Sequence, residues 1–150
     1  MNPPKIHIKS ISALETHLVR HPVLRPGLPR ETCVFDGDEV SDTLHLGAFL
    51  EYKIIGVLTL MTNPPYACAV VPNVQLRGMA VLDTERGKGI GAALVKAAER
   101  RVEQQKIGLL WMNARRIAVP FYQKMGYIIE GPGFDIPIAG PHHYMTKHIL

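Results

Sequence analysis

Three glycines at alternate positions lie in the most basic part of the sequence. The stretch 86–91 consists of Arg86, Gly87, Lys88, Gly89, Ile90 and Gly91. Glycine has no Cβ, so backbone N–H groups can approach a ligand closely, and a helix that begins there adds unsatisfied donors and a positive dipole end. The pattern favours binding of a phosphate group. A tight strand-to-helix turn without a ligand is the alternative.

Two other phosphate-binding motifs fit this stretch poorly. A P-loop needs Ser or Thr directly after its Gly-Lys pair, and Gly89 stands at that position. Gly87, Gly89 and Ala92 satisfy the loose dinucleotide-binding fingerprint. However, about four strands precede it, and the next strand ends without the acidic residue that would hold a ribose. The dinucleotide site stays an alternative that NAD binding would reveal.

The excess positive charge of the chain is confined to the same region. Residues 84–116 contain eight Lys or Arg against three Asp or Glu, whereas the rest of the chain is close to neutral. Such a surface attracts polyanions, although a solvated helix face would look the same. A nucleic-acid-binding module is therefore a second function class. No basic strand with interleaved aromatic residues supports it.

Composition indicates one globular domain over residues 1–150, with 47% hydrophobic and 20% charged residues. The longest uncharged run, 54–76, is interrupted by prolines, so no membrane span is expected. The N-terminus lacks the apolar region of an export signal, which predicts a cytoplasmic protein. Cys33 and Cys68 have no partners at metal-binding spacing, so neither a zinc site nor a disulfide is expected.

Hydrophobic patterning predicts the strands that position these residues. Alternating or continuous apolar residues indicate strands at 5–10, 43–50, 54–61, 74–82, 109–113, 127–130 and 143–149. The second and third should form an antiparallel hairpin. The strand–helix–strand order around the glycines requires a parallel pair, so the sheet must be mixed.

Helices are expected at three places. The first begins after Ser12, whose Ser-x-x-Glu sequence forms a capping box, and should end by about His21 because Pro22 follows. The second begins near Ile90, with an apolar stripe at helical spacing, and the third covers 116–124. The intervening segments 22–32, 62–73 and 131–141 should be loops.

Two motifs resemble those of the GNAT acyl-CoA-dependent N-acyltransferases. The first family motif is Gln or Arg, two residues, Gly, one residue, then Gly or Ala, and 86–91 meets it directly after a strand. Residues 113–127 are similar to the second, in which Asn and Ala precede Phe-Tyr, a Lys, and Gly with an aromatic residue. Residues 141–145, Pro-His-His-Tyr-Met, resemble the Pro-His-x-x-Met ending of a bacterial subgroup.

The resemblance implies an α/β (α+β) fold: a mixed, mostly antiparallel sheet of about six to seven strands, helices on both faces, and splayed fourth and fifth strands. It also implies acetyl-CoA as acyl donor, with no metal. The implied cofactor-binding residues are Met79, Ala80, Val81, Arg86, Gly87, Lys88, Gly89, Ile90, Gly91, Asn113, Phe121, Tyr122 and Lys124.

Acyl transfer to an amine requires a base for the amine and a proton for the leaving thiolate. Tyr122 occupies the family's tyrosine position and is the expected acid; a core aromatic residue is the alternative. The strand at 74–82 lacks the glutamate that many family members use as base. His45 is the first candidate in its place. Glu51, His142, His143 and a relayed water are the others.

The expected function is transfer of an acetyl group from acetyl-CoA to a primary amine of a small molecule or peptide, directly in a ternary complex. A catalytically silent acyl-CoA sensor is the main alternative. No nucleic-acid or membrane partner is expected, and the protein should be a monomer or homodimer. The loops at 22–32, 62–73 and 131–141 should shape the acceptor pocket.

Overall fold

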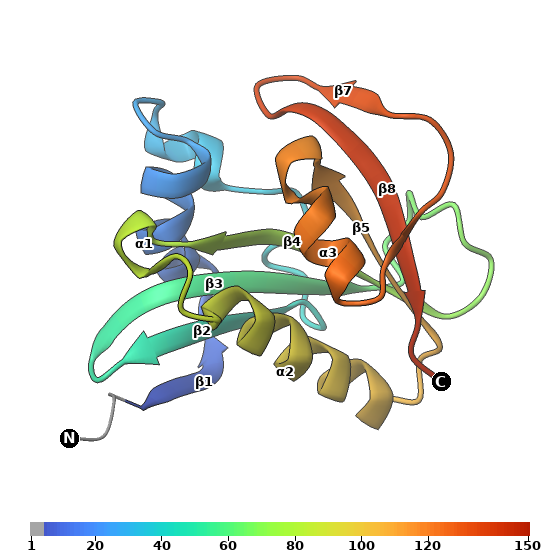
Figure 1. Cartoon of the computed structure of the whole chain (residues 1–150), viewed down its shortest axis with the longest axis horizontal. Coiled ribbons are helices and arrows are strands. Elements are labelled where there is room, and N and C mark those ends of the chain that lie inside the picture. The colour runs from blue at the N-terminus through green and yellow to red at the C-terminus, as the bar shows by residue number, and fades with distance from the viewer. Residues whose placement is uncertain (1–4) are drawn as a thin grey trace.

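The computed structural model describes residues 5–150; the first four residues, on which the export-signal prediction partly rests, lie outside the described residues. An eight-stranded sheet in the order β1-β2-β3-β4-β5-β8-β6, with β7 paired to β8, forms its centre (Figure 1). The strands are β1 (Ile6–Ile11), β2 (Leu44–Leu50), β3 (Lys53–Thr62), β4 (Asn73–Val81), β5 (Leu109–Arg115), β6 (Ile128–Ile129), β7 (Phe134–Ile136) and β8 (Gly140–His148).

All paired strands are antiparallel except β4 and β5, which run parallel. The helices are α1 (Ala13–Leu24), α2 (Ile90–Gln104) and α3 (Val119–Lys124), with 3₁₀ turns η1 (Arg30–Cys33), η2 (Asp83–Glu85) and η3 (Arg116–Ala118). The predicted mixed, mostly antiparallel sheet is confirmed. Among residues 5–150 no helix is long and apolar enough to cross a membrane, and no three or more His, Cys, Asp or Glu side chains are grouped so that they could hold a metal ion.

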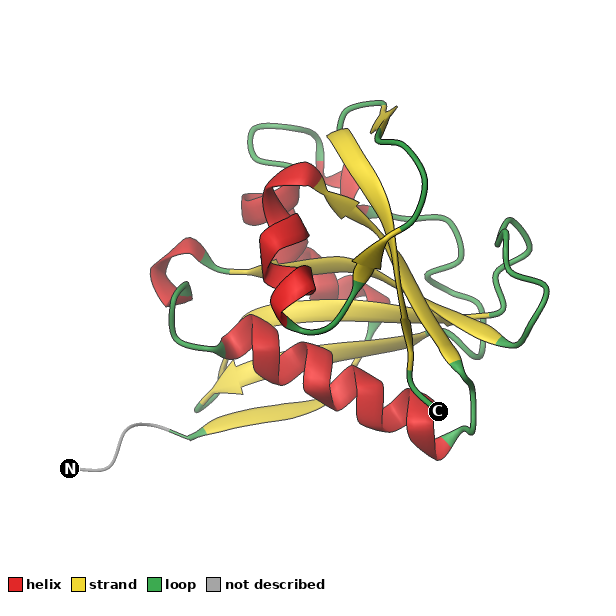
Figure 2. Ribbon diagram, turned by 45° about the vertical axis from the view of Figure 1, so that its right-hand side comes forward, coloured by secondary structure: helices red, strands yellow, loops and turns green. Residues whose placement is uncertain are grey.

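Helices cover both faces of the sheet, as predicted (Figure 2). β3 supplies side chains to both faces, and its regular alternation is interrupted at Ile55, an extra residue between the pairs Phe49–Ile54 and Ala48–Gly56. Ile55 and Leu58 pack into the main core beneath α2, whereas Ile54 and Val57 pack toward α1. α2 and α3 therefore share one face, and α1 lies on the other.

β4 and β5 diverge after a short stretch of pairing. Only residues 73–75 of β4 pair with residues 109–111 of β5, although the strands continue to Val81 and Arg115. Beyond this stretch β4 contains a bulge, where Gly78 and Met79 lie opposite Leu58 of β3 and Gly78 has a φ of +60°. The predicted splay of the fourth and fifth strands is confirmed.

The first helix is longer than predicted. α1 continues through Pro22 to Leu24, and its N-terminus has the predicted Ser12 capping box. Pro22 lies in the last turn, so only the hydrogen bond to the carbonyl of Leu18 is lost. Leu18 is on the exposed side of the helix, where water can satisfy that carbonyl.

The predicted loop at 131–141 was partly wrong. Phe134–Ile136 forms β7, and β8 begins at Gly140 rather than His143, so that the two pair as a short hairpin. Pro137 and Pro141 interrupt the apolar pattern of this segment, so the pattern does not predict these two strands. In the fold, β8 is fixed along β5 and presents a free edge that β7 pairs with.

Candidate active site

The glycine turn before α2 exposes a row of backbone amides. Gly87 and Gly89 have φ of +77° and +78°, and an added Cβ at either would meet no atom within 4 Å. Among residues 5–150 no side chain caps α2, and its first turn contains no acidic residue. The first N–H groups of this helix therefore lie beside open space at the positive end of its dipole, which is a favourable place for an anion.

Two exposed cations flank this turn. Arg86 pairs with Asp83 at 2.9 Å, and Lys88 pairs with Glu85 at 3.2 Å. The Arg86–Asp83 pair is exposed on both sides, and such pairs contribute little to stability. Lys88 is also exposed, although its partner Glu85 is mostly buried. A phosphate group at the amides can therefore compete most readily for Arg86.

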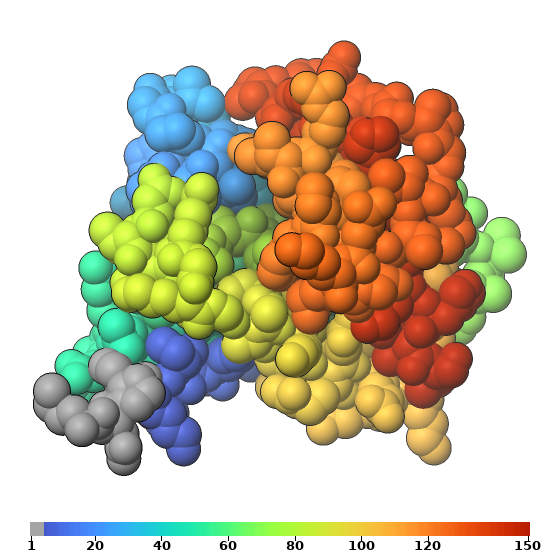
Figure 3. Space-filling view, in the orientation of Figure 1, coloured from blue at the N-terminus to red at the C-terminus, as the bar shows by residue number. Residues whose placement is uncertain are grey.

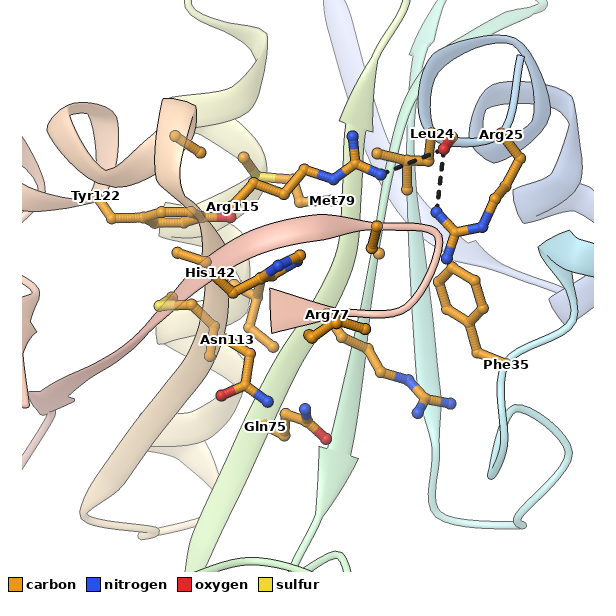
Figure 4. Close-up of a pocket in the computed structure, with 17 residues that line it drawn as sticks. Leu24, Arg25, Phe35, Gln75, Arg77, Met79, Asn113, Arg115, Tyr122 and His142 are labelled. Atoms are coloured by element: carbon orange, nitrogen blue, oxygen red, sulfur yellow. Dashed lines mark hydrogen bonds between the residues drawn. The ribbon is translucent and has the colours of Figure 1, made fainter. Parts of the chain in front are cut away.

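A cavity of about 320 Å³ passes through the gap where β4 and β5 diverge (Figure 4). Met79 and Tyr122 line it from the side of α2 and α3, while Leu24, Arg25 and Phe35 line it from the side of α1. On the face of α2 and α3 the surface is hollowed between the turn that precedes α2 and α3 itself (Figure 3). Two reactants can therefore meet in the gap from opposite faces of the sheet.

Tyr122 provides a protonated hydroxyl inside this cavity. Its side chain is 5% exposed, packs edge-on against Phe121 and Tyr127, and places its hydroxyl 3.8 Å from the sulfur of Met79. Burial raises the pKa of this phenol well above its usual range. The hydroxyl therefore keeps its proton at neutral pH. Phe121 lies over Gly91 at the start of α2, where an added Cβ would be 3.4 Å from its ring.

His142 provides an unprotonated nitrogen in the same cavity. Its Nδ1 lies 2.6 Å from the carbonyl of Gly140, so Nδ1 carries the hydrogen and donates it. The lone pair of Nε2 is then free to accept a proton. Burial lowers the pKa of His142; the bond to Gly140 opposes this shift, and nearby Arg115 and Arg25 add to it. The ring is therefore neutral at pH 7, and it stacks on Phe134.

Comparison with known proteins identifies this arrangement. The family model of the acetyltransferase (GNAT) family matches residues 11–127, which include the glycine turn, the diverging strands and α3. The chain belongs to the GNAT acetyltransferase family. A Bacillus subtilis (strain 168) protein named uncharacterized N-acetyltransferase YitI is 32% identical over 142 residues, covering 95% of both chains.

Solved structures share the GNAT fold over nearly their whole length. An aminoglycoside 6'-N-acetyltransferase complexed with coenzyme A superimposes with a TM-score of 0.75 at 14% identity, covering 96% of this chain and 97% of that one. The ribosomal-protein-S18-alanine N-acetyltransferase of Escherichia coli gives 0.72 at 15% identity, covering 97% and 94%. At these identities the likeness concerns the fold alone.

His45, the first candidate base of this GNAT protein, lies outside the cavity lining. Its Nδ1 is 2.7 Å from the Thr59 hydroxyl and its Nε2 is 2.9 Å from the carbonyl of Asp38, so both ring nitrogens are occupied in the buried interior. Glu51 is exposed at the turn between β2 and β3, and His143 is absent from the cavity lining. Of the candidate bases, the fold brings only His142 together with Tyr122.

The predicted cofactor residues divide into those near the gap and those away from it. Asn113 and Met79 line the cavity. The N–H of Leu82 donates to the carbonyl of Ile55 in β3. Because the backbone groups of successive strand residues point to opposite sides, the N–H and C=O of Val81 point to the other side of β4, from which β5 has diverged. The backbone groups of Ala80 point the other way, toward β3, because backbone direction alternates along a strand, and its side chain is buried toward α1.

The remaining predicted residues offer less to a cofactor. Ile90 is buried in the core and can contribute only its backbone amide. Lys124 is exposed at the end of α3 and does not line the cavity. Ala80 is thus the predicted cofactor contact that this geometry does not support, because its backbone is turned toward β3.

Sequence reasoning missed the basic end of the cavity. Arg25, Arg77 and Arg115 line it together with Phe35. Arg25 and Arg77 lie outside both family motifs, and Arg115 lies within the second but is not one of its defining residues. Arg115 could have been found, because it lies two residues after Asn113 and side chains two residues apart on a strand point to the same face. Arg25 carried no such signal, because the predicted end of α1 left it in a loop.

Proposed function

We propose that this GNAT protein transfers an acetyl group from acetyl-CoA directly to a primary amine. The observation that carries the proposal is the cavity between β4 and β5, which Met79 and Tyr122 line from the face of α2 and α3 and Leu24, Arg25 and Phe35 line from the face of α1. Tyr122 and His142 both face it. Family membership does not favour the nucleic-acid module or the silent sensor.

The amide row at 87–91 fits the pyrophosphate of coenzyme A. The positive φ of Gly87 and Gly89 lets the backbone N–H groups of the turn point toward a phosphate, and the open space beside both glycines leaves room for the pyrophosphate. Arg86 and Lys88 add charge, and Val81 offers backbone groups to which the pantetheine arm can bond like an added strand. The coenzyme A complex of a structural neighbour supports this donor.

The two side chains in the gap suit the two proton movements of the reaction. The amine nitrogen attacks the thioester carbonyl, a C–N bond forms and the C–S bond breaks. Nε2 of His142 accepts the proton that the amine loses, and the hydroxyl of Tyr122 donates a proton to the departing sulfur, giving an amide and a free thiol. Proton exchange with solvent restores both groups. A lysine-like amine has a pKa of about 10.4, so a base is needed near neutral pH.

The test is thiol release from acetyl-CoA across a panel of primary amines. We expect at least one amine to give turnover that Tyr122→Phe reduces strongly. The acetylated product should appear in equal amount to the thiol. Coenzyme A binding without thiol release for any amine would instead indicate a sensor.

A further inference from the structure

Two guanidinium groups converge at the α1 end of the cavity. Arg25 from the end of α1 and Arg115 from the end of β5 both donate to the carbonyl of Leu24, at 3.0 and 3.2 Å (Figure 4). They are 90 positions apart in sequence, and the fold brings them to one acceptor. Arg115 also lies directly across from His142 in the β5–β8 pair.

Neither of these two cations has a carboxylate partner in the described part of the chain. Residues 5–150 contain no ion pair to Arg25 or Arg115, and no Asp or Glu lines the cavity. An adjoining cavity does include Asp36, together with Arg25 and Arg77, but Asp36 forms no ion pair there. The cavity thus carries unbalanced positive charge.

Two nearby arginines, in contrast, have a carboxylate partner. Arg20 and Arg77 share the carboxylate of Asp38, at 2.6 and 3.0 Å. Arg25 and Arg115 are half-buried as well, and burial lowers the pKa of both. Arg25 also lowers the pKa of Arg115, because like charges repel. Two half-buried cations held together are unfavourable unless a counter-charge joins them.

We propose that the acceptor is a small primary amine that carries a carboxylate, bound by Arg25 and Arg115; this inference rests on the proposed acetyl transfer. A guanidinium matches a carboxylate with two parallel hydrogen bonds. A cavity of about 320 Å³ admits a small molecule. With its carboxylate at the two arginines, the amine would extend toward His142 and Tyr122.

The location of the pair distinguishes this role from binding of the donor's phosphates. Arg25 lies on the α1 face of the sheet, whereas the amide row at 87–91 lies on the face of α2 and α3. Phe35 supports the guanidinium of Arg25, which lies 5.2 Å from its ring centroid. The arginines therefore belong to the acceptor end of the gap.

Matched acceptors test the proposal directly. Amino acids, the corresponding amino acid amides, and phosphate-bearing amines are compared by kcat/KM with the wild type. Each amino acid should exceed its amide by at least about 10-fold, since a charge-assisted pair is lost in the amide. A preference for the phosphate-bearing amines, or equal use of acid and amide, would overturn the carboxylate assignment.

Variants assign the preference to the two arginines. Arg25→Gln and Arg115→Gln should each lower kcat/KM for the amino acid by about 10- to 100-fold, with little change for the amide or in the KM for acetyl-CoA. Arg115→Lys keeps the charge without the planar fork and should recover only part of the loss. The control is Arg116→Gln, which removes an adjacent exposed cation. A rise in the KM for acetyl-CoA alone would assign the arginines to the donor.

A binding measurement separates failure of this inference from failure of the proposed function. Calorimetric titration of N-acetyl amino acids, and of their amides, into the protein saturated with coenzyme A requires no turnover. The acids should bind at least about 10-fold more tightly than the amides, and only in proteins that retain both arginines. Equal binding would overturn the inference, whether or not the wild type releases thiol.

Discussion

The hydroxyl of Tyr122 lies 3.8 Å from the sulfur of Met79, so that α3 and β4 meet across the opening of the gap. A thioether is a weak acceptor, and this contact contributes little to stability. The phenol is therefore held by ring packing and not by its hydroxyl. Its proton remains available to a group that enters the gap.

This relationship predicts a selective effect of Tyr122→Phe. The ring and its packing remain, so the free energy of unfolding and the affinity for coenzyme A should be nearly unchanged. Loss of the acid should reduce the rate of the chemical step by about 100-fold, at the lower end of general acid catalysis because a thiolate is a tolerable leaving group. Rapid-quench measurement at saturating acetyl-CoA isolates that step from product release.

Tyr127→Phe is the matched control. Tyr127 is also buried in the core, but its hydroxyl donates to Glu99 at 2.9 Å and does not face the cavity. Its removal should cost about 1.5–3 kcal/mol of stability, because the acceptor is a carboxylate, and should leave the chemical step unchanged. If Tyr122→Phe stays within twofold of the wild type, Tyr122 is a packing residue.

The pH dependence of turnover should identify His142 as the base. Only the neutral ring can accept a proton, and burial lowers its pKa, so kcat should fall with decreasing pH at values below the ordinary histidine pKa of about 6.5. His142→Gln should lower kcat and remove this limb of the profile. His148→Gln changes an exposed histidine of the same strand and should preserve it. A limb that persists in His142→Gln would exclude His142 as the base.

Local sequence signals predicted the capping box of α1 and the glycine turn that begins α2. Ser12, the glycines at 87–91 and the stripe of α2 act through residues a few positions apart, and the splay of β4 and β5 follows from the family resemblance. The acceptor side depends on long-range register. His142 enters the cavity because β8 pairs with β5 so that His142 lies opposite Arg115, and a shift by one residue would place His143 there.

The surroundings of His45, the first candidate base, illustrate the same limit. His45 looked available within an apolar strand, but the loop before β2 brings the carbonyl of Asp38 to one nitrogen and β3 brings Thr59 to the other. Neither contact is indicated by a pattern of neighbouring residues in the sequence. Sequence reasoning could place His45 on a strand without revealing that both its nitrogens are occupied.

Coenzyme A should stabilise the folded protein. At about 100 times its dissociation constant, a ligand that binds only the native state adds ~2.7 kcal/mol. In a domain of this size that corresponds to a rise in Tm of roughly 5–10 °C. Thermal melts with coenzyme A and with NAD measure the difference. A shift with NAD and none with coenzyme A would favour the dinucleotide alternative.

Substitution of Gly89 should separate phosphate binding from turn formation. Asn tolerates positive φ better than most residues, so Gly89→Asn should fold with a modest loss of stability while its side chain fills the space beside the amides. The affinity for coenzyme A should fall by at least about 10-fold. Gly131→Asn is the control, because Gly131 has a similar φ of +81° and equally open surroundings. Equal affinity in both variants would leave Gly89 as a turn residue only.

The network that occupies His45 should stabilise the fold through Asp38. Burial alone would raise the pKa of Asp38, but hydrogen bonds and charge from Arg20, the N–H of Phe35 and the charge of Arg77 hold it below its usual range. Asp38→Asn leaves Arg20, which is 0% exposed, without a counter-charge, and should cost about 3–5 kcal/mol. Asp36→Asn, at an exposed carboxylate, should cost little.

The pH dependence of this loss tests its ionic origin. Because the folded state lowers the pKa of Asp38, its contribution is fully present above the unfolded value of about 3.9 and is lost as the pH falls toward the folded value. The difference in unfolding free energy between wild type and Asp38→Asn should therefore shrink below about pH 4. Urea denaturation at pH 7 and in acid measures it, and a difference that stays constant would show that the hydrogen bonds, rather than the charge, stabilise this network.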